Sequence, residues 1–133
     1  MRIEITKHFR FEAAHRLPKV AKGHKCGRMH GHSYKVTLVL GCDEADLLDG
    51  MVVDYADIAR AWKRLHACLD HRTLNKIEGL ENPTTEVLAP WIFDQLRSLI
   101  LDDEPAMKRV GSMLTRVTVK ESTTTTCTYP ARS

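Results

Sequence analysis

The strongest constraint on the fold of this chain is the alternation along residues 32–41, HSYKVTLVLG. Apolar side chains recur at every second position from Tyr34 to Leu40, and His32 shares their parity. In an extended strand, residues two apart point to the same face. The pattern therefore predicts a half-buried β-strand, the clearest strand signal in the chain.

Three other segments are also predicted to be strands. Residues 3–14 place isoleucines and phenylalanines at odd positions, and Leu114–Glu121 alternates again with Val117, Val119 and Glu121 on one face. Thr123–Tyr129 can form a last strand. Residues 16–29, between the first two strands, form a basic connecting loop.

Helical spacing appears twice in the middle of the chain. Tyr55–Leu69 carries an apolar stripe at intervals of three and four, with Asp54 as its N-cap. A second helix is predicted over Thr85–Leu99, where Pro90 requires either a later start or a bend. Residues 102–112 contain acidic residues, proline and glycine, and this composition predicts a loop.

The order strand, strand, helix, helix, strand, strand predicts an α+β fold. Two helices can cover one face of an antiparallel four-stranded sheet. With 133 residues, 43% of them hydrophobic and 28% charged, the chain has the length and balance of a single globular domain spanning residues 1–133.

Composition also narrows the cellular setting and the partners. The N-terminus has no long apolar run, which predicts no signal peptide, no membrane span and a cytoplasmic location. The 4 cysteines lack Cys-x-x-Cys spacing and are expected to be reduced thiols. A net charge of +3 is too small to indicate nucleic-acid binding. The basic residues of 16–28 are either a solvated loop or a site for an anion such as phosphate.

The residues with the clearest chemistry are the histidines. His30 and His32 are two apart on a strand, so both rings can reach one metal ion, and His15 ends the neighbouring strand. Three histidines leave the fourth position of Zn²⁺ open to substrate or water, as in a catalytic site. The alternative is that His15 only ends a strand.

Cys26 and the Asp70-His71 pair are candidates for proton transfer. Lys25 and Arg28 beside Cys26 favour its thiolate, although most free cysteines are small buried hydrophobes. Asp70 could orient the His71 ring for acid–base chemistry; the alternative is a charge pair at a helix end.

Three further residues are candidates for ligand contacts. Glu121 lies on an apolar face and needs donors, which a ligand with two N–H groups, an arginine or a backbone amide could supply. Thr85 and Glu86 lie at a capped helix start, where a ligand role is secondary.

Taken together, these segments resemble the 6-pyruvoyl tetrahydropterin synthase family, most closely its carboxytetrahydropterin-forming branch in queuosine biosynthesis. The resemblance covers nearly the whole chain. It is carried by FEAAHRLP (11–18), GHKCGRMHGH (23–32), LDHRTLN (69–75), LENPTTE (80–86) and VKES (119–122).

The resemblance implies a tunnelling fold, a homohexamer and active sites between subunits. It implies Zn²⁺ on His15, His30 and His32. It implies that Cys26 is the proton acceptor and that Asp70 and His71 form the relay that returns protons. It also implies that Glu121 anchors the pterin's amino-pyrimidine edge and can join that relay as a catalytic residue. The implied reaction converts 7,8-dihydroneopterin triphosphate to 6-carboxy-5,6,7,8-tetrahydropterin with release of acetaldehyde and triphosphate.

Other functions remain open from the sequence. A pyruvoyl tetrahydropterin synthase would eliminate triphosphate without breaking a carbon–carbon bond, and a zinc- and pterin-binding protein without activity would keep the same fold. The short spacing between Cys26 and His30 favours the carboxy branch, and relatives with glutamate in place of the cysteine cleave the side chain differently. The basic residues Arg10, Arg16, Lys22, Lys25 and Arg28 are candidates for holding the triphosphate.

Overall fold

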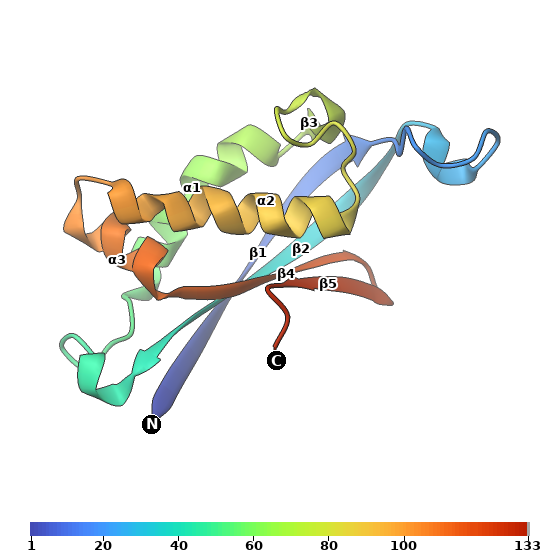
Figure 1. The fold of residues 1–133 in the computed structure, drawn as a ribbon. Helices are drawn as coiled ribbons and strands as arrows, with labels where there is room; N and C mark the ends of the chain where they lie inside the picture. The colour runs from blue at the N-terminus through green and yellow to red at the C-terminus, as the bar shows by residue number, and fades with distance from the viewer. Residues whose placement is uncertain (133) are drawn as a thin grey trace.

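A computed structural model describes residues 1–132 as a twisted five-stranded sheet with helices over one face (Figure 1). The strands are β1 (Arg2–His15), β2 (His30–Asp43), β3 (Arg72–Thr73), β4 (Leu114–Ser122) and β5 (Thr125–Tyr129). The helices are α1 (Tyr55–Leu69), α2 (Thr85–Arg97) and α3 (Pro105–Met113). The sheet order is β3-β1-β2-β4-β5, and the predicted α+β class is confirmed.

The long hairpin of β1 and β2 forms the centre of the sheet. Its strands pair antiparallel from Arg2 opposite Asp43 to His15 opposite His30. Phe11 and Tyr34 face the helices, are almost fully buried and stack with ring centroids 4.8 Å apart. The face that alternation predicted to be apolar is therefore the face that the helices cover.

Helix α1 covers the β1 side of the sheet and has the predicted bounds. Asp54 caps it by accepting a hydrogen bond from the Ala56 backbone N–H at 2.8 Å. Its buried stripe includes Trp62, whose ring stacks on Phe9 with centroids 5.1 Å apart. Cap and stripe together fix this helix on the strand that ends at His15.

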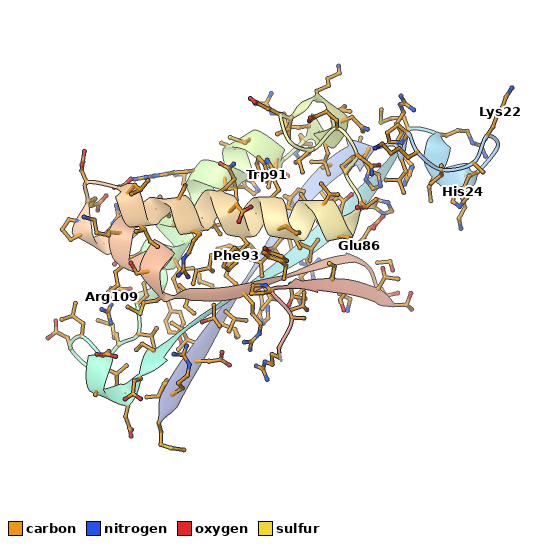
Figure 2. The ribbon with its side chains drawn as sticks, in the orientation of Figure 1. Lys22, His24, Glu86, Trp91, Phe93 and Arg109 are labelled. Atoms are coloured by element: carbon orange, nitrogen blue, oxygen red, sulfur yellow. The ribbon has the colours of Figure 1, made fainter. Side chains whose placement is uncertain are left out.

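Helix α2 begins at Thr85, so of the two alternatives that Pro90 left open, the later start is wrong. Thr84 caps the helix by accepting from the Val87 N–H at 3.2 Å, and Pro90 lies inside the helix. Phe93 on this helix packs against Tyr129 of β5, with ring centroids 5.5 Å apart (Figure 2). None of the helices among residues 1–132 is long and apolar enough to span a membrane.

The prediction of two helices with a loop over 102–112 is wrong, because α3 occupies most of that segment. Pro105 is the first helical residue, where a missing N–H costs nothing. Gly111 lies against the short 3-10 turn η4 (Ser98–Leu101), and a Cβ there would be 2.6 Å from the backbone nitrogen of Ile100. Proline and glycine, which suggested a loop, here start a helix and permit close packing.

The prediction of a purely antiparallel four-stranded sheet is also corrected. The additional strand, β3, has two residues and pairs parallel with β1, with Arg72 opposite Ala13 and Thr73 opposite Ala14. Two residues are too few to show a period in the sequence, which is why alternation could not reveal this strand.

The predicted connecting loop, residues 16–29, projects from one end of the β1–β2 hairpin (Figure 1). We call this segment the basic arm. The Leu17 N–H donates to the Cys26 carbonyl at 2.7 Å and closes the arm near its base. Figure 2 shows Lys22 and His24 at its outer part, away from the sheet.

Candidate metal centre and active site

Three histidines and one glutamate meet where the basic arm leaves the sheet. Hairpin pairing sets His15 opposite His30, and His32 follows on the same face. Glu121 arrives from the end of β4. One ligand atom from each of these four residues lies within 4.8 Å of all the others, so the set could hold a metal ion.

Backbone carbonyls fix the protonation of two of the rings. The Nδ1–H of His15 donates to the Pro83 carbonyl at 2.9 Å, and the Nδ1–H of His30 donates to the Arg28 carbonyl at 2.7 Å. A carbonyl only accepts, so in the neutral rings both Nε2 atoms carry lone pairs. These two atoms are 3.1 Å apart. Two lone pairs at this distance repel unless a cation lies beside them. In metal sites, carbonyls that accept from the other ring nitrogen orient histidine ligands in this way.

His32 adds a third nitrogen that protein groups leave unsatisfied. Its Nε2 is buried and has no hydrogen-bond partner among residues 1–132. Glu121 Oε1 lies 2.8 Å away, but the contact does not meet hydrogen-bond geometry. Burial lowers the pKa of His32, which favours the neutral ring that a metal requires.

Glu121 supplies the negative charge of the cluster. Besides its contact with His32, Glu121 Oε1 lies 3.5 Å from His15 Nε2, so the carboxylate borders two of the three rings. Glu121 is also the extra residue of a β-bulge, because Lys120 pairs with Thr126 while Ser122 pairs with Thr125. Bulges bend a strand and redirect side chains, often beside functional sites.

The donor set fits a divalent transition-metal ion. Three imidazole nitrogens and one carboxylate oxygen are ligands of Zn²⁺ and of its neighbours in the first transition row. A cation would satisfy both the unpartnered His32 nitrogen and the opposed lone pairs of His15 and His30.

The predicted Asp70-His71 pair is formed, and β1 holds it. The Asp70 carboxylate accepts from the Glu12 backbone N–H at 2.9 Å and from His71 Nδ1–H at 2.8 Å. These bonds, the one from Glu12 first, lower the pKa of Asp70. His71 has a left-handed backbone with φ of 57°, an uncommon conformation outside glycine that brings its ring back toward Asp70.

A cavity of about 440 Å³ joins the cluster to this pair, since His32 and His71 both line it. Ala14, with a single methyl group, and Gly31, with no side chain, pair across β1 and β2 and line part of its wall. Its volume is within the usual range for a small-molecule site.

The structure does not bring every predicted residue into this cluster. Cys26 lies on the basic arm, where its backbone N–H donates to His24 Nδ1 at 3.0 Å. It is not one of the four clustered residues. Thr85 and Glu86 contact each other at the start of α2, with 2.8 Å between Thr85 Oγ1 and Glu86 Oε1.

Sequence patterns missed the residues that position the histidines. Asn75 accepts from the Arg16 N–H at 3.0 Å and donates to the Arg16 carbonyl at 2.8 Å, which fixes the chain directly after His15. The Tyr34 hydroxyl lies 3.2 Å from His15 Nδ1, and burial raises the pKa of Tyr34, so this hydroxyl stays protonated. Asn75 belongs to a recognisable motif, but no spacing rule names its partner.

The chain is similar to known proteins of one enzyme family. The profile of the 6-pyruvoyl tetrahydropterin synthase family matches residues 4–132. A 6-carboxy-5,6,7,8-tetrahydropterin synthase of Synechocystis sp. is 42% identical over 96 residues, 69% of this chain and 73% of the relative. The enzyme of that name from Bacillus subtilis is 31% identical over 134 residues, 95% of this chain and 84% of the relative.

Proteins named for other pterin reactions are also similar to this chain. A dihydroneopterin monophosphate aldolase of Pyrococcus furiosus is 32% identical over 103 residues, 77% of this chain and 82% of the relative. Among solved structures, 6-pyruvoyl tetrahydropterin synthase of Caenorhabditis elegans superposes with a TM-score of 0.79 at 26% identity, covering 99% of this chain and 97% of that one.

Proposed function

The chain belongs to the 6-pyruvoyl tetrahydropterin synthase family, and from this premise we propose that it is a zinc-dependent lyase that forms 6-carboxy-5,6,7,8-tetrahydropterin. The proposed substrate is 7,8-dihydroneopterin triphosphate, and the proposed co-products are acetaldehyde and triphosphate. The relatives that bear this activity in their names, at 42% and 31% identity, support the choice within the family. A role in queuosine biosynthesis and a cytoplasmic location stay predictions.

The observation that carries the proposal is the arrangement of the three rings. His15 and His30 present lone pairs set by backbone carbonyls, and His32 presents a buried nitrogen without a partner. We assign Zn²⁺ to these three residues. When bound, Zn²⁺ would act as a Lewis acid that polarises the oxygens of the substrate side chain and acidifies the neighbouring C–H bond.

The remaining roles fall to residues around the cavity. Cys26 would accept the proton from the substrate carbon as a general base. Asp70 would orient His71, and His71 would return a proton to the pterin. Glu121 would accept from the two N–H groups of the amino-pyrimidine edge, with Thr85 and Glu86 as further contacts for the substrate.

We further propose that active sites form between subunits of a homohexamer. Two features of the chain support this arrangement. The cavity beside His32 and His71 is open, and Cys26 lies on an arm that projects from the sheet (Figure 1). A neighbouring subunit could bring its own arm to such a cavity and complete the set of catalytic groups.

A second candidate is the pyruvoyl-forming reaction, which eliminates triphosphate and keeps the carbon skeleton. The similarity to the C. elegans structure favours it. The third alternative is a zinc- and pterin-binding protein without activity. Cys26 and the formed Asp70-His71 pair speak against that alternative, because binding alone needs neither a thiolate nor a relay.

The test is product analysis. The zinc-loaded protein is incubated with 7,8-dihydroneopterin triphosphate, with and without a chelator and with a trap for acetaldehyde, and the products are identified by mass spectrometry. The proposal predicts a carboxylated tetrahydropterin and trapped acetaldehyde, both lost after chelation and restored by Zn²⁺.

Other outcomes of this experiment would support one of the two alternative functions. A pyruvoyl product without acetaldehyde would assign it to the second candidate. Absence of turnover by folded protein with full zinc occupancy would assign it to the binding role.

A further inference from the structure

The sheet face opposite the helices carries a row of positive charge. Arg10 on β1 pairs directly with Lys35 on β2, and Lys35 pairs directly with Lys120 on β4. Parity places all three on the face that no helix covers (Figure 1). Among residues 1–132, no carboxylate forms an ion pair with any of them.

The next row of residues on this face contains hydrogen-bond donors and no acidic residue. Pairing across the four strands gives two rows of the same parity: Arg10, Lys35, Lys120 and Thr126, then His8, Thr37, Thr118 and Thr128. We call these eight residues the donor band. His8 Nδ1 lies 2.8 Å from Thr37 Oγ1, and the hydroxyls of Thr118 and Thr128 lie 3.0 Å apart.

The acidic residues at the two ends of the band are already engaged. Glu12 accepts from the Ser33 hydroxyl at 2.7 Å. Glu4 accepts from both terminal nitrogens of Arg116, at 2.9 and 3.0 Å. Neither carboxylate contacts the cations of the band, so their charges are left for another partner.

This row of cations is unfavourable for the chain alone. Like charges directly opposite across strands destabilise a sheet, and Lys35 has a cation on each side. Lys35 and Lys120 are also half-buried, which reduces the water available to each ammonium group. A sheet face that served only to cover a core could carry neutral polar residues at these positions.

We propose that the donor band is a binding site for a linear polyphosphate, with triphosphate as its ligand. Adjacent strands are about 4.8 Å apart, so the three cations span about 10 Å. That span suits a short chain of linked phosphates, which several cations and hydroxyls can bind together. A compact single phosphate would reach one or two of them.

The band is distinct from the metal centre, because consecutive residues of a strand face opposite sides. Lys120 belongs to the band while Glu121 contacts His32. Two sources could supply the ligand: the triphosphate released in the proposed reaction, or the triphosphate tail of a substrate held at the metal centre of a neighbouring subunit. Only this choice of source rests on the proposed function.

Binding is tested with sodium tripolyphosphate and the zinc-loaded full chain, by calorimetry at low and high salt. The double variant K35Q/K120Q should bind about tenfold more weakly than the wild type, and the difference should shrink in high salt. The matched control K63Q/K108Q removes the same charge from exposed positions on α1 and α3 and should bind like the wild type. The melting temperature without ligand should be equal or higher for K35Q/K120Q, since a repulsion is relieved.

Three results would overturn the proposal. The first is that the wild type does not bind tripolyphosphate. The second is that K35Q/K120Q and K63Q/K108Q weaken binding equally. The third is that K22Q/K25Q in the basic arm loses binding while K35Q/K120Q binds like the wild type. Because tripolyphosphate binding needs no turnover, the binding test does not depend on which pterin product the protein forms.

Steady-state kinetics then identify the source. A higher KM for the pterin triphosphate in K35Q/K120Q supports the substrate tail. An unchanged KM with weaker inhibition by tripolyphosphate supports the released product.

Discussion

The two nitrogens of His15 and of His30 have different tasks. Nδ1 of each ring is bound to a backbone carbonyl, of Pro83 and Arg28 respectively, so Nε2 is left for the cluster. The Pro83 carbonyl comes from the segment before α2, which ties the orientation of His15 to the packing of that helix. A change that moves this segment should therefore affect the metal site without touching a ligand.

Replacing one ring should remove the metal. His30→Ala leaves two histidines and a carboxylate, so bound zinc measured by mass spectrometry should fall from about one ion per chain to near zero, and turnover should fall at least about 100-fold. His66→Ala, which changes a half-buried histidine on α1 outside the cluster, is the control and should keep its zinc. Full occupancy in His30→Ala would show that the ligand assignment is wrong.

Replacing Cys26 should reduce turnover without removing the metal. Because Cys26 is not part of the cluster, Cys26→Ala should retain zinc while turnover drops about 100-fold or more, the usual contribution of a general base. Cys68→Ala, an exposed cysteine on α1, should retain both zinc and activity. Unchanged turnover in Cys26→Ala would favour the binding role over catalysis.

The clustering of the three histidines was predictable from the sequence, and the groups that orient them were not. His30 and His32 follow from strand parity, and His15 follows because hairpin pairing sets it opposite His30. The face of Glu121 was predicted as well, but its contact with His32 depends on a bulge that leaves no mark in the alternation. Carbonyls such as that of Pro83 belong to the backbone, so residue type gives no signal for them.

Helices α1 and α3 show which features make a helix predictable from its sequence. Helix α1 has an N-cap and a continuous apolar stripe, and both of its predicted ends agree with the structure. Helix α3 has nine residues and contains Pro105 and Gly111, so local composition favoured a loop. The glycine is explained only by its contact with η4, a tertiary feature that a sequence window does not contain.

That contact gives a prediction for stability. In Gly111→Ala the new methyl group would lie 2.6 Å from the Ile100 nitrogen and 2.9 Å from the Leu99 carbonyl carbon, both backbone atoms that cannot turn aside. The free energy of unfolding should fall by about 1–3 kcal/mol, as for other overpacked sites. Urea denaturation measures it.

Ser112→Ala is the neighbouring control for this contact. Ser112 is an exposed residue of the same helix, and its replacement should change stability by less than about 0.5 kcal/mol. Equal stability of Gly111→Ala and the wild type would mean that α3 can move away from η4 at little cost.

On the scale of the whole molecule, one ion pair joins β1 to β4 across the central strand β2. Glu4 on β1 reaches across β2 at Gly41 to Arg116 on β4, and it also contacts Arg132 at 3.1 Å. A Cβ on Gly41 would lie 3.1 Å from Glu4 Cγ, so this position needs a residue without a side chain. The hydrogen bond from Arg116 is the main cause that lowers the pKa of Glu4.

The lowered pKa predicts how this pair contributes with pH. A carboxyl whose pKa is lower in the folded state stabilises the fold above its unfolded pKa and loses that contribution as pH falls through the folded value. Glu4→Gln should thus be less stable than the wild type near pH 7, by about 1 kcal/mol. The difference should vanish as acid protonates Glu4.

Denaturation of both proteins across a pH series measures this effect. A matched control is Glu78→Gln, an exposed glutamate away from this contact, which should show no such convergence. A difference between Glu4→Gln and the wild type that is constant down to the lowest pH would contradict the role of the carboxylate charge.

The closure of the basic arm has a practical consequence for protein engineering. Since the Leu17 N–H and the Cys26 carbonyl meet at its base, residues 18–25 form a loop whose ends stay together whatever its length. Doubling such a loop costs only about 0.6 kcal/mol in closure entropy. A reporter peptide could therefore be grafted at the tip near Lys22 without shifting the histidine register, which would place a probe on the segment that carries the thiol.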